Sequence, residues 1–285
     1  MTKKKEEKIK PVKKQITAAN LPIGLASELA KLPPMPEHGY KIAVIPDVQA
    51  MPGVPMEHLT WAGQYLCEKR PDIIVCIGDF GDFPSLSRWG QGQGYASWEG
   101  RRYKDDLNAF HQAMQLFLTP IRDEAGYDPT KVFTLGNHEA FIDRFVEENP
   151  ILQGHMSLDD LKLPEYGWQV FEFMQPVNIA GTAFCHFFPS GIMGRPITAA
   201  RTLLSRLHMS AFAGHQQGRM IDFAKRADGT DMTAIISGSF YQHEYDYLSP
   251  FTNKHWRGMY MLHEVKAGSY DEMPVSIDFL RRRYG

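Results

Sequence analysis

Five short segments of this chain carry side chains of the types that bind metal ions, and most of them follow an apolar run. They span residues 45–49, 78–82, 136–139, 185–186 and 214–217. The first two contain aspartates, the third an Asn–His pair, and the last two one histidine each. Because open α/β sheets bind ligands beyond the carboxyl ends of their strands, this order predicts a metal site on a sheet edge.

These side chains suit the chemistry of phosphate esters. Asp47 and Asp79 close the first two predicted strands, where two carboxylates can share divalent cations. Two metal ions about 3.5–4 Å apart form a clamp for in-line displacement at phosphorus, and their charge neutralises the phosphate oxygens as the reaction proceeds. Asn137 offers an amide oxygen, and His138 beside it can protonate the leaving oxygen.

Alternating strands and helices must position these segments. Continuous apolar runs predict strands, and apolar residues at three- and four-residue steps predict helices. The predicted strands cover residues 41–46, 72–77, 131–135, 168–173, 177–179, 182–186, 209–213, 233–236, 259–265 and 275–280. The predicted helices cover 57–69, 102–121, 141–148, 158–163 and 197–207, with Pro120 ending or kinking the second. This pattern predicts parallel βαβ units that lead into a larger mixed sheet system.

Residues 1–38 differ from the rest of the chain. They are rich in Lys and Glu, which predicts a flexible tail with a short helix at 25–32, followed by one domain over 39–285. No apolar segment follows the first lysines, so no signal peptide is expected, and no apolar run approaches the roughly 20 residues that span a bilayer. The three cysteines are too few and too irregular for a disulfide framework, which favours a reducing, cytoplasmic compartment.

The motifs together resemble a known family. The order Asp-x-Gln, Gly-Asp-x-x-Asp, Gly-Asn-His-Glu, His and Gly-His-x-Gln, between about Lys41 and Arg219, is similar to the calcineurin-like metallophosphoesterase superfamily. Residues 78–83 followed by 85–89 resemble a branch common in bacteriophages and prophages, which places the protein in the host cytoplasm. The resemblance implies a four-layered α/β/β/α sandwich with mixed central sheets, and hydrolysis of phosphomonoesters or phosphodiesters.

The same resemblance implies roles for single residues. Asp79 is expected to bridge two ions, and His138 to be the catalytic acid, with Asp82 supporting it. Asp47 is expected to bind the second ion. The first ion is completed by three further ligands, Asn137, His186 and His215.

This chain departs from the family pattern at two positions. Gln49 and Gln217 stand where the family usually has histidine, and both replacements fall on the ion held by Asp47. The resulting set of Asp47, Gln49, Asp79 and Gln217 is all oxygen, which suits Mg²⁺, Mn²⁺ or Ca²⁺ better than Zn²⁺ or iron. We therefore expect one tight site and one weaker site, with Mn²⁺ as the preferred ion and Mg²⁺, Ca²⁺, Zn²⁺ and iron as alternatives.

Residues outside the motifs are assigned by their neighbours in the sequence. Three arginines are candidates for binding phosphate oxygens, namely Arg88, Arg195 and Arg219. Trp89, Tyr95 and Trp98 form an aromatic-rich loop that either stacks on a base or, as the favoured alternative, packs as a cap. Glu139 is interpreted as a first-turn residue of the next helix, stabilised by the helix dipole. His243 has no partner in the pattern and is assigned a structural or surface role.

Three functions compete at this stage. The favoured one is a metal-dependent phosphoesterase acting on a phosphate-ester substrate, with nucleotides or nucleic acid slightly preferred. The second is a phosphate- or nucleic-acid-binding protein with a degenerate site and no turnover. The third is a phosphoprotein phosphatase, although the Arg-containing run usual in such enzymes is not evident. The net charge of -2 gives no strong overall attraction to nucleic acid, no membrane partner is expected, and the oligomeric state stays open.

Overall fold

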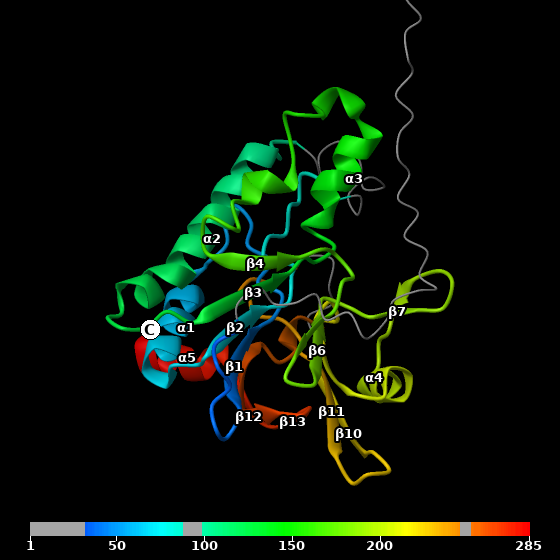
Figure 1. The fold of residues 1–285 in the computed structure, drawn as a ribbon. Helices are drawn as coiled ribbons and strands as arrows, with labels where there is room; N and C mark the ends of the chain where they lie inside the picture. The colour runs from blue at the N-terminus through cyan, green and yellow to red at the C-terminus, as the bar shows by residue number, and fades with distance from the viewer. Residues whose placement is uncertain (1–31, 88–98, 246–251) are drawn as a thin grey trace, which may run out of the picture.

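The computed structural model describes residues 32–87, 99–245 and 252–285 (Figure 1). The predicted tail over 1–38 therefore lies largely outside the described residues, and so does the short helix at 25–32. None of the described helices is both long enough and apolar enough to cross a membrane.

Two sheets form the centre of the molecule. The strands of the first are β1 (Tyr40–Ile45), β2 (Ile73–Cys76), β3 (Thr130–Thr134), β4 (Trp168–Phe171), β12 (Gly258–Lys266) and β13 (Ser269–Ser276). They lie in the order β13-β12-β1-β2-β3-β4, and β1 to β4 are parallel. The predicted βαβ units are thus present, and β12 and β13 add antiparallel strands at one edge.

The second sheet is built from the later part of the chain. Its strands are β5 (Val177–Ile179), β6 (Thr182–Cys185), β9 (Ser210–Ala213), β10 (Met220–Lys225) and β11 (Asp231–Ile236), in the order β10-β11-β9-β6-β5. β6, β9 and β11 are parallel to one another. A small hairpin of β7 (Pro189–Ser190) and β8 (Arg195–Pro196) projects after β6.

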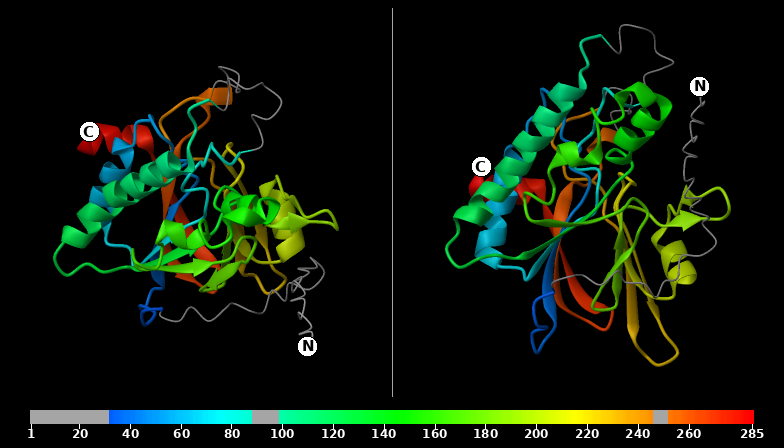
Figure 2. Two further views of the ribbon diagram at one scale, coloured as in Figure 1. Left: turned by 90° about the horizontal axis from the view of Figure 1, so that it is seen from above. Right: turned by 45° about the horizontal axis from the view of Figure 1, so that its top comes forward.

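Helices cover the outer faces of the two sheets. They are α1 (Glu57–Lys69), α2 (Tyr103–Asp123), α3 (Ala140–Glu148), α4 (Ala200–Leu207) and α5 (Ile277–Tyr284), with short 3₁₀ turns η3 (Pro150–Leu152), η4 (Leu158–Leu161) and η5 (Thr252–Lys254). Figure 2 shows α1, α2 and α5, in blue, teal and red, on one side of the sheets and α4, in yellow-green, on the other.

Alternation along the strands explains these layers. Successive side chains of a strand point to opposite faces of its sheet. Val44 of β1 and Phe212 of β9 belong to the core between the sheets. Their neighbour Ala43 packs with the α1 and α2 residues, and Ala211 packs with α4. Both sheets are therefore buried on two faces, which is why their strands are continuous apolar runs. The expected α/β sandwich is confirmed.

The prediction that Pro120 ends or kinks the second helix is wrong as to the end, because α2 continues to Asp123. Proline lacks the N–H that would bond the carbonyl four residues earlier. That carbonyl belongs to Leu116 and accepts a hydrogen bond of 3.5 Å from the hydroxyl of Thr60 on α1. The neighbouring helix thus supplies the donor that the proline cannot.

The predicted strand over 275–280 is wrong for residues 277–280, which are helical. β13 ends at Ser276, and α5 begins at the next residue. The Ser276 hydroxyl accepts a hydrogen bond of 3.1 Å from the N–H of Phe279, which caps the helix. Strand β10 was not predicted because it lies at a sheet edge and is largely exposed, so it lacks an apolar run.

Candidate metal centre

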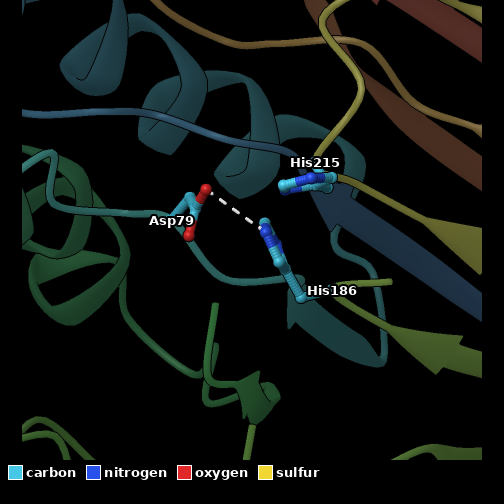
Figure 3. A group of neighbouring side chains, drawn as sticks. All are labelled: Asp79, His186 and His215. Carbon is cyan, nitrogen blue, oxygen red and sulfur yellow. Dashed lines mark ion pairs between the residues drawn. The ribbon is translucent and has the colours of Figure 1, made fainter. Parts of the chain in front are cut away.

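Four strand ends from both sheets meet at one point. Asp79 follows β2 and Asn137 follows β3 in the first sheet, while His186 follows β6 and His215 follows β9 in the second. Figure 3 shows Asp79, His186 and His215 pointing toward one another. Their ligand atoms all lie within 4.8 Å of one another.

Asn137 completes this group, which we call the Asp79 cluster. The Nε2 atom of His186 lies 3.2 Å from Oδ2 of Asp79 and 3.0 Å from Oδ1 of Asn137. The same Asn137 oxygen lies 2.8 Å from Nδ1 of His215. Two sheets with long sequence gaps between them therefore deliver two oxygens and two nitrogens to one small volume.

The chemistry of this donor set fits a divalent cation. His186 donates from Nδ1 to the carbonyl of Ile77 at 2.9 Å, which leaves a lone pair on its Nε2. That lone pair faces two oxygen acceptors, on Asp79 and Asn137. Acceptors that converge in this way repel one another unless a positive charge lies between them. A carboxylate, an amide oxygen and two imidazoles are ligands that divalent transition metals accept.

When no ion is bound, a proton on the Nε2 atom of His186 takes the place of the cation. Burial lowers the pKa of His186, but the Asp79 carboxylate outweighs it and raises that pKa to about 9. Burial would raise the pKa of Asp79, yet the charges of His186 and His138 hold it well below its usual range. Burial and the adjacent His186 lower the pKa of His215 to about 4. The cluster thus favours positive charge at its centre.

Close backbone packing sets the positions of these loops. A Cβ atom on Gly136 would lie 2.1 Å from the carboxylate of Asp79, and one on Gly214 would lie 2.5 Å from that of Asp47. Any other residue at either position would displace a carboxylate of the site. Three site residues adopt left-handed backbone angles that are unusual for side chains other than glycine, namely Gln49, Asp79 and His215.

Glu139 holds two of the loops together. It is not the first-turn residue that was predicted, because it precedes α3 as its N-cap residue. Its carboxylate is fully buried and accepts hydrogen bonds from four backbone N–H groups. They belong to Asp79, Phe80, Gly81 and Gly136, at 2.8–3.3 Å. One carboxylate therefore joins the segment after β2 to the segment after β3, an arrangement that local sequence cannot reveal.

His138 lies beside the Asp79 cluster. Its Nδ1 is 3.1 Å from the Asp82 carboxylate and 2.5 Å from the Asp82 carbonyl oxygen, and its Nε2 is 3.7 Å from Asp79. Burial lowers the pKa of His138, but Asp79 and Asp82 outweigh it and raise the pKa to about 10. The structure thus brings together the predicted acid and its supporting carboxylate, while their catalytic roles stay predictions.

The predicted second set of ligands is held differently. Asp47 is fully buried, and its carboxylate accepts the N–H of His215 at 3.1–3.2 Å. Burial raises the pKa of Asp47 to about 7. The side-chain oxygen of Gln49 accepts a hydrogen bond of 2.8 Å from the Tyr245 hydroxyl.

The other glutamine, Gln217, also accepts a hydrogen bond from a tyrosine. The Tyr241 hydroxyl donates to the side-chain oxygen of Gln217 at 2.8 Å. Tyr241 and Tyr245 belong to an extended segment, 241–245, which we call the tyrosine segment. Its role was missed from the sequence, although the alternation Tyr-x-His-x-Tyr signals one shared face.

Arg257 fixes the tyrosine segment. Its guanidinium donates to the carbonyls of Tyr241 and His243 at 3.4 and 2.7 Å and lies 4.5 Å from the Tyr241 ring centre. The ring of His243 stacks on Tyr241 and meets Tyr245 edge-on. Both His243 nitrogens are buried, and neither has a hydrogen-bond partner in the described part of the chain. The sequence pattern did not predict that this histidine lies at the site.

The three arginines predicted to bind phosphate are not joined to the Asp79 cluster by any contact between described residues. Arg219 is exposed and lies over the rings of Trp256 and Tyr260, 5.1 and 5.7 Å from their centres. Arg195 is exposed on β8. Arg88 and the aromatic loop of Trp89, Tyr95 and Trp98 lie outside the described residues. Phosphate binding by these residues stays a prediction.

Comparison with known proteins gives one link. No protein-family profile matches the chain. The chain is similar to the Gene 54 protein of Mycobacterium phage D29, with 35% identity over 99 residues. The match covers 35% of this chain and 36% of the phage protein, so it spans about a third of either. The match relates the chain to a bacteriophage protein, in agreement with the predicted resemblance to a branch common in bacteriophages.

Proposed function

We propose that the protein hydrolyses phosphate esters with the help of a divalent cation bound at the Asp79 cluster. The observation that carries the proposal is the meeting of Asp79, Asn137, His186 and His215 from two sheets, with His138 beside them. Mn²⁺ is the proposed ion. The similarity of the motifs to calcineurin-like metallophosphoesterases supports the reaction class.

The residues around the cluster have separate tasks in this proposal. When bound, a divalent cation supplies Lewis acidity to the attacking water and charge for the phosphate oxygens. His138 donates its Nε2 proton to the leaving oxygen. Asp82 holds the opposite ring nitrogen and so orients the imidazole. Glu139 keeps the loops of Asp79 and Asn137 in register through their backbone N–H groups.

The substrate class is proposed more broadly than the reaction. Phosphodiesters and phosphomonoesters both suit the site, and nucleotides or nucleic acid are preferred because of the phage relationship. The alternative of a binding protein without turnover draws on the two glutamines whose oxygens are taken up by tyrosines. The contact between His138 and Asp82 supports turnover, since a binding protein needs no oriented proton donor.

Hydrolysis of bis-p-nitrophenyl phosphate tests the proposal. We expect turnover that depends on added Mn²⁺ and falls about 10²–10⁴-fold in His138→Ala, the range for loss of a general acid. Asn137→Ala is expected to lose turnover and to weaken Mn²⁺ binding. His155→Ala, at an exposed histidine, is the matched control and should leave turnover unchanged. Turnover without metal, or turnover that both site variants retain, would reject the proposal.

A further inference from the structure

The two glutamines beside the Asp79 cluster have their amide groups oriented by tyrosines. Tyr245 donates to the oxygen of Gln49, and Tyr241 donates to the oxygen of Gln217. Neither glutamine nitrogen has a hydrogen bond to any residue that the structure describes. The two amides come from the first and last motif segments, and the Asp47 carboxylate and the His215 N–H join these segments.

This orientation decides what the amides can bind. A side-chain amide is planar, with an acceptor oxygen on one arm and two N–H donors on the other. The phenol takes one of the two lone pairs of the oxygen and fixes the amide plane, and the N–H donors are the groups that have no partner among the described residues. N–H donors repel a cation and bind an anion. Of the two carboxylates expected at this position, Asp79 belongs to the Asp79 cluster, and Asp47 already accepts the N–H of His215.

The tyrosine segment is held firmly enough to impose this orientation. Arg257 binds the carbonyls of Tyr241 and His243, and the rings of Tyr241 and Tyr245 pack edge-on at 5.5 Å. An independent observation is an unsatisfied polar ring within the same segment. His243 lies between the two tyrosines, is 9% exposed, and has two ring nitrogens without a partner among the described residues. Burial of an unsatisfied polar ring costs free energy, which a bound ligand can offset.

We propose that the protein holds a single divalent cation, at the Asp79 cluster, and that Gln49 and Gln217 donate amide N–H groups to a phosphate oxygen where a second cation would otherwise bind. The choice of phosphate as the anion rests on the proposed function. The inference of a single cation does not rest on the proposed function, because it is drawn from the hydrogen bonds of the two glutamines. In this proposal an anion takes the position where a weak, all-oxygen second cation site was expected.

Electron paramagnetic resonance of the Mn²⁺-loaded full chain counts the ions without any turnover. We expect one Mn²⁺ per chain and the six-line spectrum of an isolated ion. The double variant Gln49→His/Gln217→His should bind a second Mn²⁺ and give the spectrum of a coupled pair. A coupled pair in the wild-type protein would overturn the single-cation proposal, whether or not the protein hydrolyses phosphate esters.

Calorimetry with inorganic phosphate tests the amide donors on the same Mn²⁺-loaded protein. Gln49→Met and Gln217→Met keep the side-chain length and remove the N–H groups, so each should weaken phosphate binding about fivefold, the effect of one neutral hydrogen bond. Gln216→Met, in the same loop, is the matched control and should bind like the wild type. Tyr245→Phe, which frees the Gln49 amide to turn, should weaken binding by a smaller factor. Equal affinities in all five proteins would overturn the assignment of the amides.

Discussion

The Asp79 cluster and the tyrosine segment use the acceptor atoms around them in opposite ways. In the cluster, acceptor atoms of Asp79, Asn137 and His186 converge on one point, which a proton or a cation must occupy. In the tyrosine segment, the nearby acceptors on Gln49 and Gln217 are each already paired with a hydroxyl. The comparison shows that the hydrogen-bond partners of a candidate ligand matter as much as its type.

A substitution at Glu139 should separate the two regions most strongly, because the Asp79 cluster depends on Glu139 and the tyrosine segment does not. Glu139→Gln replaces one acceptor oxygen by an N–H₂ group that would face backbone N–H donors. We expect the free energy of unfolding to fall by about 3 kcal/mol, as for a lost set of charge-assisted hydrogen bonds, with weaker Mn²⁺ binding. Urea unfolding and calorimetry measure both, and a variant as stable as the wild type would contradict the role given to Glu139.

Asp82 separates metal binding from proton donation within the cluster. Asp82→Asn removes the charge beside His138 but keeps the backbone carbonyl that also accepts from its Nδ1. We expect kcat to fall by about tenfold, a fraction of the full general-acid effect, while the affinity for Mn²⁺ stays the same. A parallel loss of Mn²⁺ binding would mean that Asp82 supports the cluster rather than the proton donor.

His58 makes the tyrosine region sensitive to acid. Its Nε2 donates to the carbonyl of Phe240, and its Nδ1 accepts from Gln242, within and beside the tyrosine segment. Burial lowers the pKa of His58 from its ordinary 6.5 to about 3. Between these values the unfolded chain binds a proton that the folded chain does not, so stability rises with pH there, by about 1.4 kcal/mol per pH unit.

Urea unfolding at pH 7.5 and pH 5.5 measures this contribution. From the higher to the lower pH, the wild type should lose about 1.4 kcal/mol more stability than His58→Gln, because only the unit below pH 6.5 contributes. Other titrating groups affect both proteins alike. An identical pH dependence in the two proteins would show that His58 accepts a proton in the folded state.

Tyr245→Phe is expected to have the smallest effect. It removes one neutral hydrogen bond to Gln49, so the free energy of unfolding should fall by about 1 kcal/mol. Mn²⁺ binding at the Asp79 cluster should stay the same. Added Mn²⁺ should therefore raise the unfolding temperature of the variant as much as that of the wild type. A change in Mn²⁺ affinity at the cluster would mean that the two regions are energetically coupled.

Many of the helices and strands could be predicted from the sequence because they depend on the local spacing of apolar residues. The first helix has the predicted bounds, Glu57–Lys69, since its apolar stripe is regular and Arg70 closes it in a left-handed conformation. The meeting of the strand-end ligands followed from the rule that parallel strands end at one edge. The end of α2 did not follow, because Thr60 of another helix supplies the missing donor at Pro120.

The parts that the sequence did not predict depend on contacts between distant segments. Glu139 bonds to residues about 60 positions earlier, and Tyr245 bonds to Gln49 across 196 positions. His243 looked like any unpaired histidine until its two ring neighbours were known. Polar networks of this kind have no period and no motif, so pattern alone cannot place them.

Anomalous diffraction from crystals soaked in Mn²⁺ would locate the bound ions directly. We expect one strong peak between Asp79, Asn137, His186 and His215, and none between Gln49 and Gln217. A protein with no bound Mn²⁺ among those four side chains would contradict the central claim that the Asp79 cluster is a metal centre.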